Sequence, residues 1–454
     1  MKRIVTVFCL FSLLLARRAQ SEVPAGAMES LVGPLTPMGA PAEATGIATY
    51  DAAEQSRGKF FAEQFPYQPN DLVSSNYYDL ALTLYVAYYR SGDTYWLDQA
   101  RRVARTWRDS NNNQNIPKYL AADYSVGPTI PPPRSMSTLG LAVLALESGD
   151  AAAREVVNNH ARLVEQAFVQ WMDAREAGYS LMALVAASIV GDDHRLSALG
   201  MLDVILAHQK PDGHWEQTSN LVPNNQPFVL NFMTGVLMEG LVFYDRVIGD
   251  PRIVPAIQRC IDWTWGTQWV AGAQAFQYGN VNSGSVSTSP AGDLNGLMLP
   301  AWGWALLRTG DSRYRDQGQQ IFAGMVANSN ALLGEKHYGQ FYRSSGRYLG
   351  FLQAFDARNA PQSSQPQPLP PPPTPDSSTP APVTAPAGCT QDSDCNDNPC
   401  ATGICDPSGS CSYVDKGTCC CQQFAAHCFT GCNGCRGTCA PGQCTATNVG
   451  GRCE

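Results

Sequence analysis

Runs of hydrophobic residues alternate with amphipathic segments along most of this chain, and short Gly-Asp turns separate them. The run from Tyr77 to Tyr89 is apolar almost throughout, as expected for a helix that is buried on all sides. The segment after it has apolar residues at helical spacing from Trp96 to Trp107, which predicts a helix with one buried face. The first predicted unit is therefore a helical hairpin.

The same alternation recurs along the chain. Gly-Asp pairs stand at Gly92-Asp93, Gly149-Asp150, Gly191-Asp192, Gly249-Asp250 and Gly310-Asp311. A repeat of roughly 40 to 60 residues is typical of arrays of helical hairpins. One set of wholly buried helices and one set of half-exposed helices predicts two concentric layers. A sixth hairpin closes the ring if a helix over residues 50–64 pairs with the segment 348–355, so the predicted fold is all-α, an (α/α)6 toroid over residues 45–358.

Three segments of this region carry a resemblance to known proteins. They are YYRSGDTYWL at 88–97, QKPDGHW at 209–215 and RTGDSRY at 308–314. The region resembles the six-hairpin glycosidase-like toroids, a superfamily that includes many glycoside hydrolases and polysaccharide lyases. The resemblance covers nearly all of residues 45–358 and implies a carbohydrate-active enzyme. It does not identify the reaction, because one fold supports many chemistries.

The N-terminus has the features of an exported protein. Lys2 and Arg3 precede an apolar stretch that ends at Ala16, and small residues follow up to Ser21, which predicts a signal peptide over residues 1–21. The stretch is shorter than the roughly 20 residues that span a bilayer, and no later segment is predicted to cross a membrane. We therefore expect a bacterial type of export, with the mature protein secreted or associated with the cell surface. Residues 22–44 form an N-terminal extension before the toroid.

A cysteine-rich module is predicted at the other end of the chain. Fourteen of the 16 cysteines lie between Cys389 and Cys453, which in an exported chain predicts a disulfide-rich module over residues 389–454 without fixing the pairing. Residues 359–388 are rich in Pro, Ser, Gln and Thr and predict an extended linker. Since secreted polysaccharide-degrading enzymes have a similar layout, the module is a candidate for attachment to a cell surface or polymer. Stabilisation of the C-terminus is the alternative.

Charge and motifs exclude several classes of function. Removal of residues 1–21 takes away four positive charges and no acids, so the net charge falls from −8 to −12. An acidic chain disfavours nucleic acid as a partner, because nucleic-acid binding depends on clustered Lys and Arg. The sequence has no glycine-rich phosphate loop, no Gly-x-Ser-x-Gly motif and no His-x-x-x-His metal pair. We therefore expect neither a cofactor nor a metal.

The connections between hairpins indicate which end of the ring is functional. The Gly-Asp turns are short, whereas the opposite connections, 109–134, 209–227, 266–294 and 328–347, are long. Long connections in a compact domain are often functional. We therefore expect the site at the N-terminal ends of the buried helices, where free backbone N–H groups and helix dipoles face a hydroxyl-rich or anionic ligand.

Carboxylates near these connections are the first catalytic candidates. Hydrolysis of a glycosidic bond uses one protonated and one ionised carboxyl group across a cleft. The candidates are Asp71, Asp79, Asp212, Glu216 and Asp293. Each also has a structural interpretation: Asp293 stands where a helix cap is expected, and Asp212 belongs to an Asp-Gly turn.

Aromatic and amide side chains on the same connections are candidates for contact with a polysaccharide. In the functional interpretation Trp215 stacks on a sugar ring, and in the structural one it packs beneath its loop. The candidate substrate-binding residues are Asn76, Tyr77, Trp215, Phe276, Tyr278 and Asn295.

β-Elimination from a uronate polymer is the alternative reaction. In such a lyase a Tyr or His removes the C5 proton while an Arg neutralises the substrate carboxylate. The candidate set is Tyr124, Tyr179, His214 and Arg134, although ordinary ion pairs and core tyrosines explain the same residues. A non-catalytic glycan-binding surface protein is the third hypothesis, because no spacing rule shows that these distant residues converge.

Overall fold

The computed structural model describes residues 26–39, 44–66, 72–110, 132–332 and 336–359, and four short strands between 401 and 453. The chain divides into two compact units, Met1–Ser363 and Ser364–Glu454. The predicted signal peptide, Asp71, Tyr124, the linker and most of the cysteine-rich module lie outside the described residues. Those predictions stand as they were made from the sequence.

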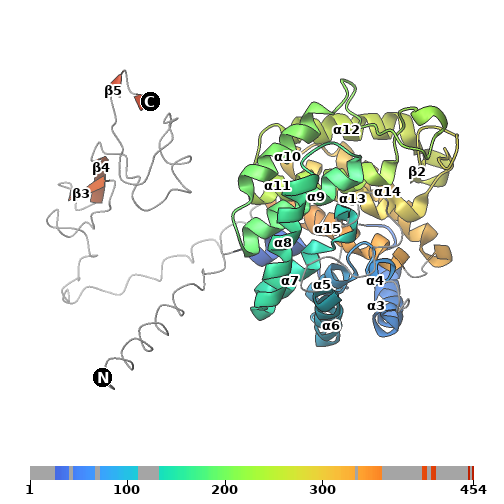
Figure 1. The fold of residues 1–454 in the computed structure, drawn as a ribbon, viewed down its shortest axis with the longest axis horizontal. Coiled ribbons are helices and arrows are strands. Elements are labelled where there is room, and N and C mark those ends of the chain that lie inside the picture. Colours follow the sequence, from blue (N-terminus) through green and yellow to red (C-terminus); the bar gives the residue numbers. More distant parts are fainter. Residues whose placement is uncertain are drawn as a thin grey trace, which may run out of the picture. The chain divides into compact units, whose positions relative to one another are not determined.

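Six of the described helices form a closed inner ring (Figure 1). They are α5 (Leu80–Ser91), α7 (Thr138–Ser148), α9 (Ala174–Val190), α11 (Asn231–Val247), α13 (Leu299–Thr309) and α15 (Lys336–Asn359). Each packs against the next in chain order, and α15 packs back against α5. In α5 the whole run 80–87 is buried, which explains why no single face of this helix is polar.

A second layer of helices covers the inner ring from outside. It consists of α3 (Ile47–Gln64), α6 (Thr94–Ser110), α8 (Ala151–Ala167), α10 (Arg195–Ala207), α12 (Ile253–Gln268) and α14 (Arg313–Leu332). In α6 the buried residues follow one stripe that includes Trp96, Val103 and Trp107, as its amphipathic pattern predicts. The prediction of an all-α (α/α)6 toroid is confirmed.

The Gly-Asp turns join the two layers. Gly92, Gly149, Gly249 and Gly310 have φ between 68 and 82°, a left-handed conformation that glycine adopts without a steric penalty. The following Asp accepts N–H groups of the next helix; for example, Asp150 accepts a hydrogen bond of 2.8 Å from the Ala153 N–H. These turns therefore end one helix and begin the next within a few residues.

Ring closure differs from the prediction in one respect. The Tyr50 and Ser345 hydroxyl oxygens lie 2.7 Å apart, so α3 and α15 do form the sixth pair. However, α14 continues to Leu332 and α15 begins at Lys336. The predicted long connection over 328–347 is therefore wrong. This stretch contains polar residues, among them Arg343, and the sequence pattern therefore indicated a loop where the structure has a buried helix.

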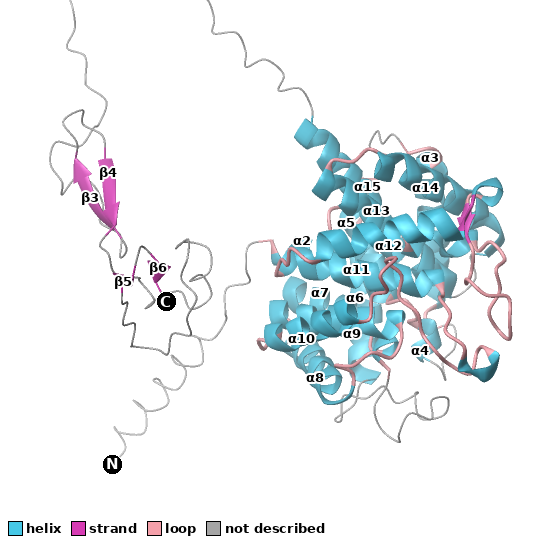
Figure 2. Ribbon diagram, turned by 90° about the horizontal axis from the view of Figure 1, so that it is seen from above, coloured by secondary structure: helices cyan, strands magenta, loops and turns pink. Residues whose placement is uncertain are grey.

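The remaining described elements are short. They are α2 (Ala27–Val32), α4 (Leu72–Ser75), η1 (Pro133–Ser135), η2 (Pro223–Asn225), η3 (Ala271–Ala273), η4 (Gly292–Leu297) and the strand pair β1 (Trp269–Val270) and β2 (Ala275–Phe276) (Figure 2). In the second unit β3 (Ala401–Cys405) pairs with β4 (Cys411–Asp415), and β5 (Asn448–Val449) pairs with β6 (Arg452–Cys453). None of the helices in the described ranges is long and apolar enough to cross a membrane.

Different segments of the chain lie over the two ends of the ring. We call the end where the inner helices begin the top and the end where they finish the base. The connections from α10 to α11 and from α12 to α13 lie at the top. The segment 26–39, which we call the strap, lies at the base, because it contacts Arg90 and Arg246 in the last turns of α5 and α11.

Candidate functional site

The turn over residues 209–216 is built as a structural unit. The side-chain nitrogen of Gln209 donates to the carbonyl oxygens of Gly213 and Ala256, each at 2.8 Å. Trp215 is 1% exposed, and its indole nitrogen donates to the carbonyl oxygen of Ile205. The prediction that Trp215 stacks on a sugar is therefore wrong, because the ring packs beneath its loop.

The titratable residues of this turn contact one another. The Nδ1 atom of His214 lies 2.6 Å from Asp212, and its ring stacks on Trp263 of α12 with centroids 4.6 Å apart. Glu216 pairs with Lys210 and lies 3.7 Å from the Nε2 atom of His214. The three catalytic candidates Asp212, His214 and Glu216 therefore lie together, beside α12 of the outer layer.

Phe276 and Asn295 have structural roles. Phe276 is 2% exposed and packs between the rings of Trp269 and Trp302, with centroids at 5.0 and 5.4 Å. The buried amide of Asn295 donates to the carbonyl oxygens of Gln274 and Ile321 and accepts from the Phe276 N–H. The prediction of substrate contact is wrong for both residues, because their side chains are buried and hold together the connection between α12 and α13.

Asp79 is committed to joining two inner helices. It is 3% exposed and caps α5 by accepting from the Leu82 N–H at 3.2 Å. It also accepts from the Gly140 N–H of α7 at 2.9 Å. Burial raises the pKa of this carboxyl group above its ordinary value, although the two backbone hydrogen bonds oppose the shift. Because both oxygens are engaged in the scaffold, a catalytic role for Asp79 is not supported.

Three candidate residues lie near one another at the top, together with Arg175, which the sequence analysis did not single out. Arg175 of α9 donates to the Tyr77 hydroxyl oxygen at 3.2 Å. Burial raises the pKa of Tyr278, and the charges of Arg175, Tyr77 and Asp293 act on it too, so these side chains share one neighbourhood. The Tyr278 ring also stacks on Phe232, with centroids 5.6 Å apart. We call Tyr77, Arg175, Tyr278 and Asp293 the top cluster.

Asp293 is anchored without being buried. It stands in the first turn of η4, and its carboxylate accepts from the Gln340 side chain at 3.2 Å. Gln340 also donates to the Asp293 carbonyl oxygen at 3.0 Å. Because the neutral Gln340 amide binds one oxygen of this half-buried carboxylate, the other oxygen is left for further contacts.

Asp173 lies beside the top cluster and was missed by the sequence analysis. It caps α9 by accepting from the Glu176 N–H at 2.9 Å. Burial, and next the negative charge of Glu176, raise the pKa of Asp173, while Arg175 opposes the shift. A carboxyl group with a raised pKa is suited to act as a general acid. The signal in the sequence was the Asp-x-x-Glu pattern at 173–176, which is typical of the first turn of a helix.

Arg134 and Tyr179 lie near this region but are engaged. Arg134 pairs with Glu176, which also accepts from the Arg134 N–H at 3.0 Å. The Tyr179 hydroxyl oxygen accepts from Arg343 at 3.3 Å, and burial raises the Tyr179 pKa far above its ordinary value. Such a phenol holds its proton firmly, so Tyr179 is a poor general base.

Several buried polar atoms at the top have no hydrogen-bond partner. They are the amide oxygen and nitrogen of Asn76, the Nε atom of Arg175 and the amide oxygen of Asn231. Unpaired buried polar atoms are rare in folded proteins and are costly. These atoms leave hydrogen-bonding capacity for a polar ligand where the inner helices begin, although other unpaired buried atoms, such as the Thr36 hydroxyl oxygen of the strap, lie elsewhere in the described residues. No arrangement of three or more His, Cys, Asp or Glu residues suited to a metal ion occurs in the described part of the chain.

Comparisons with known proteins agree on architecture. No protein-family model and no curated protein sequence matches the chain. A polysaccharide lyase structure is 11% identical, with a TM-score of 0.50, over 68% of this chain and 99% of the lyase. An unsaturated glucuronyl hydrolase specific for heparin is 11% identical, with a TM-score of 0.48, over 64% of this chain and 87% of the hydrolase.

A third similar structure is cellobiose 2-epimerase from Spirochaeta thermophila, which is 12% identical with a TM-score of 0.47, over 63% of this chain and 86% of the epimerase. Structural matches at sequence identities this low indicate the fold and not the reaction. The closed inner ring, the outer layer and the alternating order of their helices independently describe the same architecture. The chain therefore has the six-hairpin (α/α)6 glycosidase-like fold.

Proposed function

We propose that this protein is a secreted carbohydrate-active enzyme that hydrolyses glycosidic bonds of a polysaccharide at the top of the ring. The observation that carries the proposal is the position of two carboxyl groups where inner helices begin: Asp173 caps α9 two residues before Arg175, and Asp293 stands in the first turn of η4 before α13. The charge of Arg175 acts on Asp173, and the charges of Arg175 and Asp293 both act on Tyr278. The cysteine-rich tail belongs to the proposal as an attachment to a cell surface or polymer.

The two carboxyl groups suit different roles. Burial and Glu176 favour the protonated form of Asp173, which then acts as the general acid toward the leaving oxygen. Asp293, held by Gln340, acts as the second carboxyl group on the other side of the bond. Of the five carboxylates that the sequence suggested, the proposal keeps Asp293 and replaces Asp79 with Asp173. Both oxygens of Asp79 accept backbone N–H groups, whereas Asp173 caps α9 through Oδ1.

The aromatic residues of the top cluster supply contacts for the substrate. Tyr77 and Tyr278 are half-buried, so each ring has a covered face and an exposed part. A phenol combines an apolar ring with a hydrogen-bonding tip, which suits a sugar. Arg175, with one unpaired nitrogen, supplies a further donor.

β-Elimination is the second candidate, and one contact favours it. The guanidinium group of Arg175 lies 3.2 Å from the Tyr77 hydroxyl oxygen. A tyrosine next to an arginine can remove a proton from carbon while the arginine neutralises a neighbouring carboxylate. In this version Tyr77 takes the place that the sequence assigned to Tyr179 or Tyr124.

The decisive experiment is incubation of the mature protein with a panel of neutral and uronate polysaccharides. Reducing ends without ultraviolet absorbance support hydrolysis, whereas both signals together indicate an unsaturated product and support elimination. Asp173→Asn and Asp293→Asn serve as controls and remove the hydrolytic signal. Retention on a polysaccharide gel with neither signal contradicts catalysis and supports the glycan-binding alternative.

A further inference from the structure

The strap is held at the base by arginine side chains. Arg90 donates to the Thr36 carbonyl oxygen at 3.2 Å, and Arg246 donates to the Glu29 carbonyl oxygen at 2.9 Å. Arg347 donates to two further carbonyl oxygens of the strap, at 2.9 and 3.1 Å. Backbone carbonyls that receive charged donors in a buried place are held more firmly than by neutral hydrogen bonds. The strap is thus an integral part of the base.

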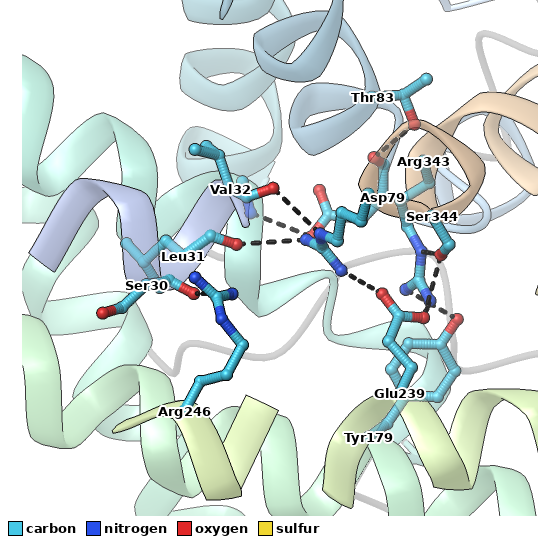
Figure 3. A network of polar contacts seen from close by, with 12 residues as sticks. Ser30, Leu31, Val32, Asp79, Thr83, Tyr179, Glu239, Arg246, Arg343 and Ser344 are labelled. Carbon is cyan, nitrogen blue, oxygen red and sulfur yellow. Dashed lines mark hydrogen bonds and ion pairs between the residues drawn. The ribbon is translucent and has the colours of Figure 1, made fainter. Parts of the chain in front are cut away.

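One of these arginines continues into the interior of the ring. Arg347 pairs with Glu239 of α11. Glu239 pairs in turn with Arg343 (Figure 3). The Ser344 hydroxyl also donates to Glu239 at 2.9 Å. Arg343 is fully buried, Glu239 is 2% exposed and Arg347 is 6% exposed. Charges buried in this way tolerate few alternative arrangements, because losing a partner leaves an uncompensated charge.

The chain of contacts ends below the top cluster. Arg343 donates to the Tyr179 hydroxyl oxygen at 3.3 Å. The pKa of Tyr179 is raised mainly by burial, and the charges of Arg343, Tyr77 and Arg175 also act on it. Tyr179 also stands four residues after Arg175 on α9, so the two side chains share one face of this helix. The side chains form a connected path from the strap through α15, α11 and α9.

We propose that Arg343 is a positioning residue for the top cluster and that the strap sets its position through Arg347 and Glu239. This inference rests on the proposed function, because it assigns the top as the reacting end. Its physical content is that Arg343 fixes the Tyr179 hydroxyl, and that Tyr179 shares a face of α9 with Arg175, which contacts Tyr77. The strap thereby acts on the site from the opposite end of the ring.

Two glycines of the strap provide a matched pair of variants. Gly33 has φ of +86°, and a Cβ atom there would meet the Arg347 side chain at 2.8 Å. Gly39 has φ of +74°, and a Cβ atom there would meet nothing within 4 Å. Both substitutions strain the backbone of the same segment, and Gly33→Ala does so more strongly because Gly33 has ψ of 173°. Only Gly33→Ala also displaces Arg347, and Arg347→Lys separates that effect from the backbone strain.

The expected effect of Gly33→Ala is a fall in kcat of roughly 3- to 30-fold relative to Gly39→Ala, with KM changed less than kcat. A readout without substrate is amide hydrogen exchange in peptides that cover 174–182 at the start of α9. We expect faster exchange there in Gly33→Ala than in Gly39→Ala. Arg347→Lys, which keeps the charge beside Glu239 but loses hydrogen bonds to the strap, is the second variant if Gly33→Ala does not fold.

The outcomes separate this inference from the proposed function. If no carbohydrate is cleaved, the proposed function fails, and exchange at 174–182 still decides whether the strap acts on α9. Exchange changes confined to 26–39 and 343–350, or equal in both glycine variants, overturn the inference even in an active enzyme. Faster exchange at 174–182 in Gly33→Ala alone, with the larger effect on kcat, supports it.

Discussion

The base and the top of the ring use arginine in opposite ways. At the base, Arg347 donates to the strap, and in the interior of the ring it shares the buried Glu239 with Arg343, so that protein groups satisfy both arginines. At the top, Arg175 contacts Tyr77 and pairs with Glu176 at 3.3 Å, while its Nε atom is buried without a partner. Fully paired charges specify one arrangement of the helices, whereas incompletely paired ones keep interaction capacity for a ligand. The comparison assigns stability to one end and recognition to the other.

The substitution Glu239→Gln tests this comparison with the largest expected effect. This change leaves two buried arginines with a neutral partner, so we expect a loss of about 3–5 kcal/mol in the free energy of unfolding, measured with urea. The matched control is Glu147→Gln, which removes a partly exposed pair with Arg101 and is expected to cost about 1 kcal/mol or less. Equal losses in the two variants would show that the base does not depend on its buried charges.

The corresponding change at the top is Asp173→Asn or Asp293→Asn. Each should lower kcat by about 10²- to 10⁴-fold, as removal of a general acid or base does. Stability should change little, because the Asn oxygen in Asp173→Asn can still cap α9. Rates are measured by the release of reducing ends, with Asp212→Asn as the control. Near wild-type rates in the first two variants, or a comparable loss in the control, would move the site elsewhere.

The stability of the fold should depend on pH through Glu54. This side chain is fully buried beside Arg90, and burial raises its pKa to about 7 although Arg90 opposes the shift. A carboxyl group with a higher pKa in the folded state stabilises the fold when protonated. Its contribution is complete below the ordinary pKa of glutamate and is lost as pH rises through about 7.

The variant Glu54→Gln should lack this dependence. Between pH 5 and pH 8 the stability of the wild-type protein should therefore fall relative to Glu54→Gln by about 2 kcal/mol. Urea unfolding of both proteins at several pH values measures the difference. Parallel curves would show that Glu54 is ionised throughout this range.

The smallest expected effect concerns two glycines in open space. A Cβ atom at Gly92, in a turn at the base, or at Gly266, within α12, would meet nothing within 4 Å. Only Gly92 has a positive φ, of 70°. Gly92→Ala should therefore cost about 1–2 kcal/mol, while Gly266→Ala should be stabilising by up to about 1 kcal/mol. Thermal unfolding distinguishes the two, and a shared sign would show that the backbone conformation of the turn is not the cause.

Periodicity was sufficient to predict the toroid, because each inner helix except one contains a long apolar run. The exception is α15, where Arg343 and Arg347 are buried only because Glu239 of another helix pairs with them. A local pattern contains no information on such a distant partner. The start of this helix was therefore interpreted as a connection.

The site was predicted in part for similar reasons. Tyr77, Tyr278 and Asp293 were found because they precede inner helices on the predicted functional end. Asp173 was missed because the search followed long connections, and its own connection from α8 to α9 is short. Trp215 was misassigned because only the distant Ile205 carbonyl shows that the ring lies beneath its loop. Which residues form local turns was predictable, and which of them face a ligand was not.

The contact between Tyr50 and Ser345 has a consequence for the order in which the molecule folds. These residues are 295 positions apart, yet they join the first and last helices of the ring. Neighbouring hairpins can form from local contacts as soon as their residues are present, whereas this closure must bring the two ends of the domain together. Ring closure should therefore be the last step of folding, and a chain that is cut before α15 should hold several hairpins in an open arc.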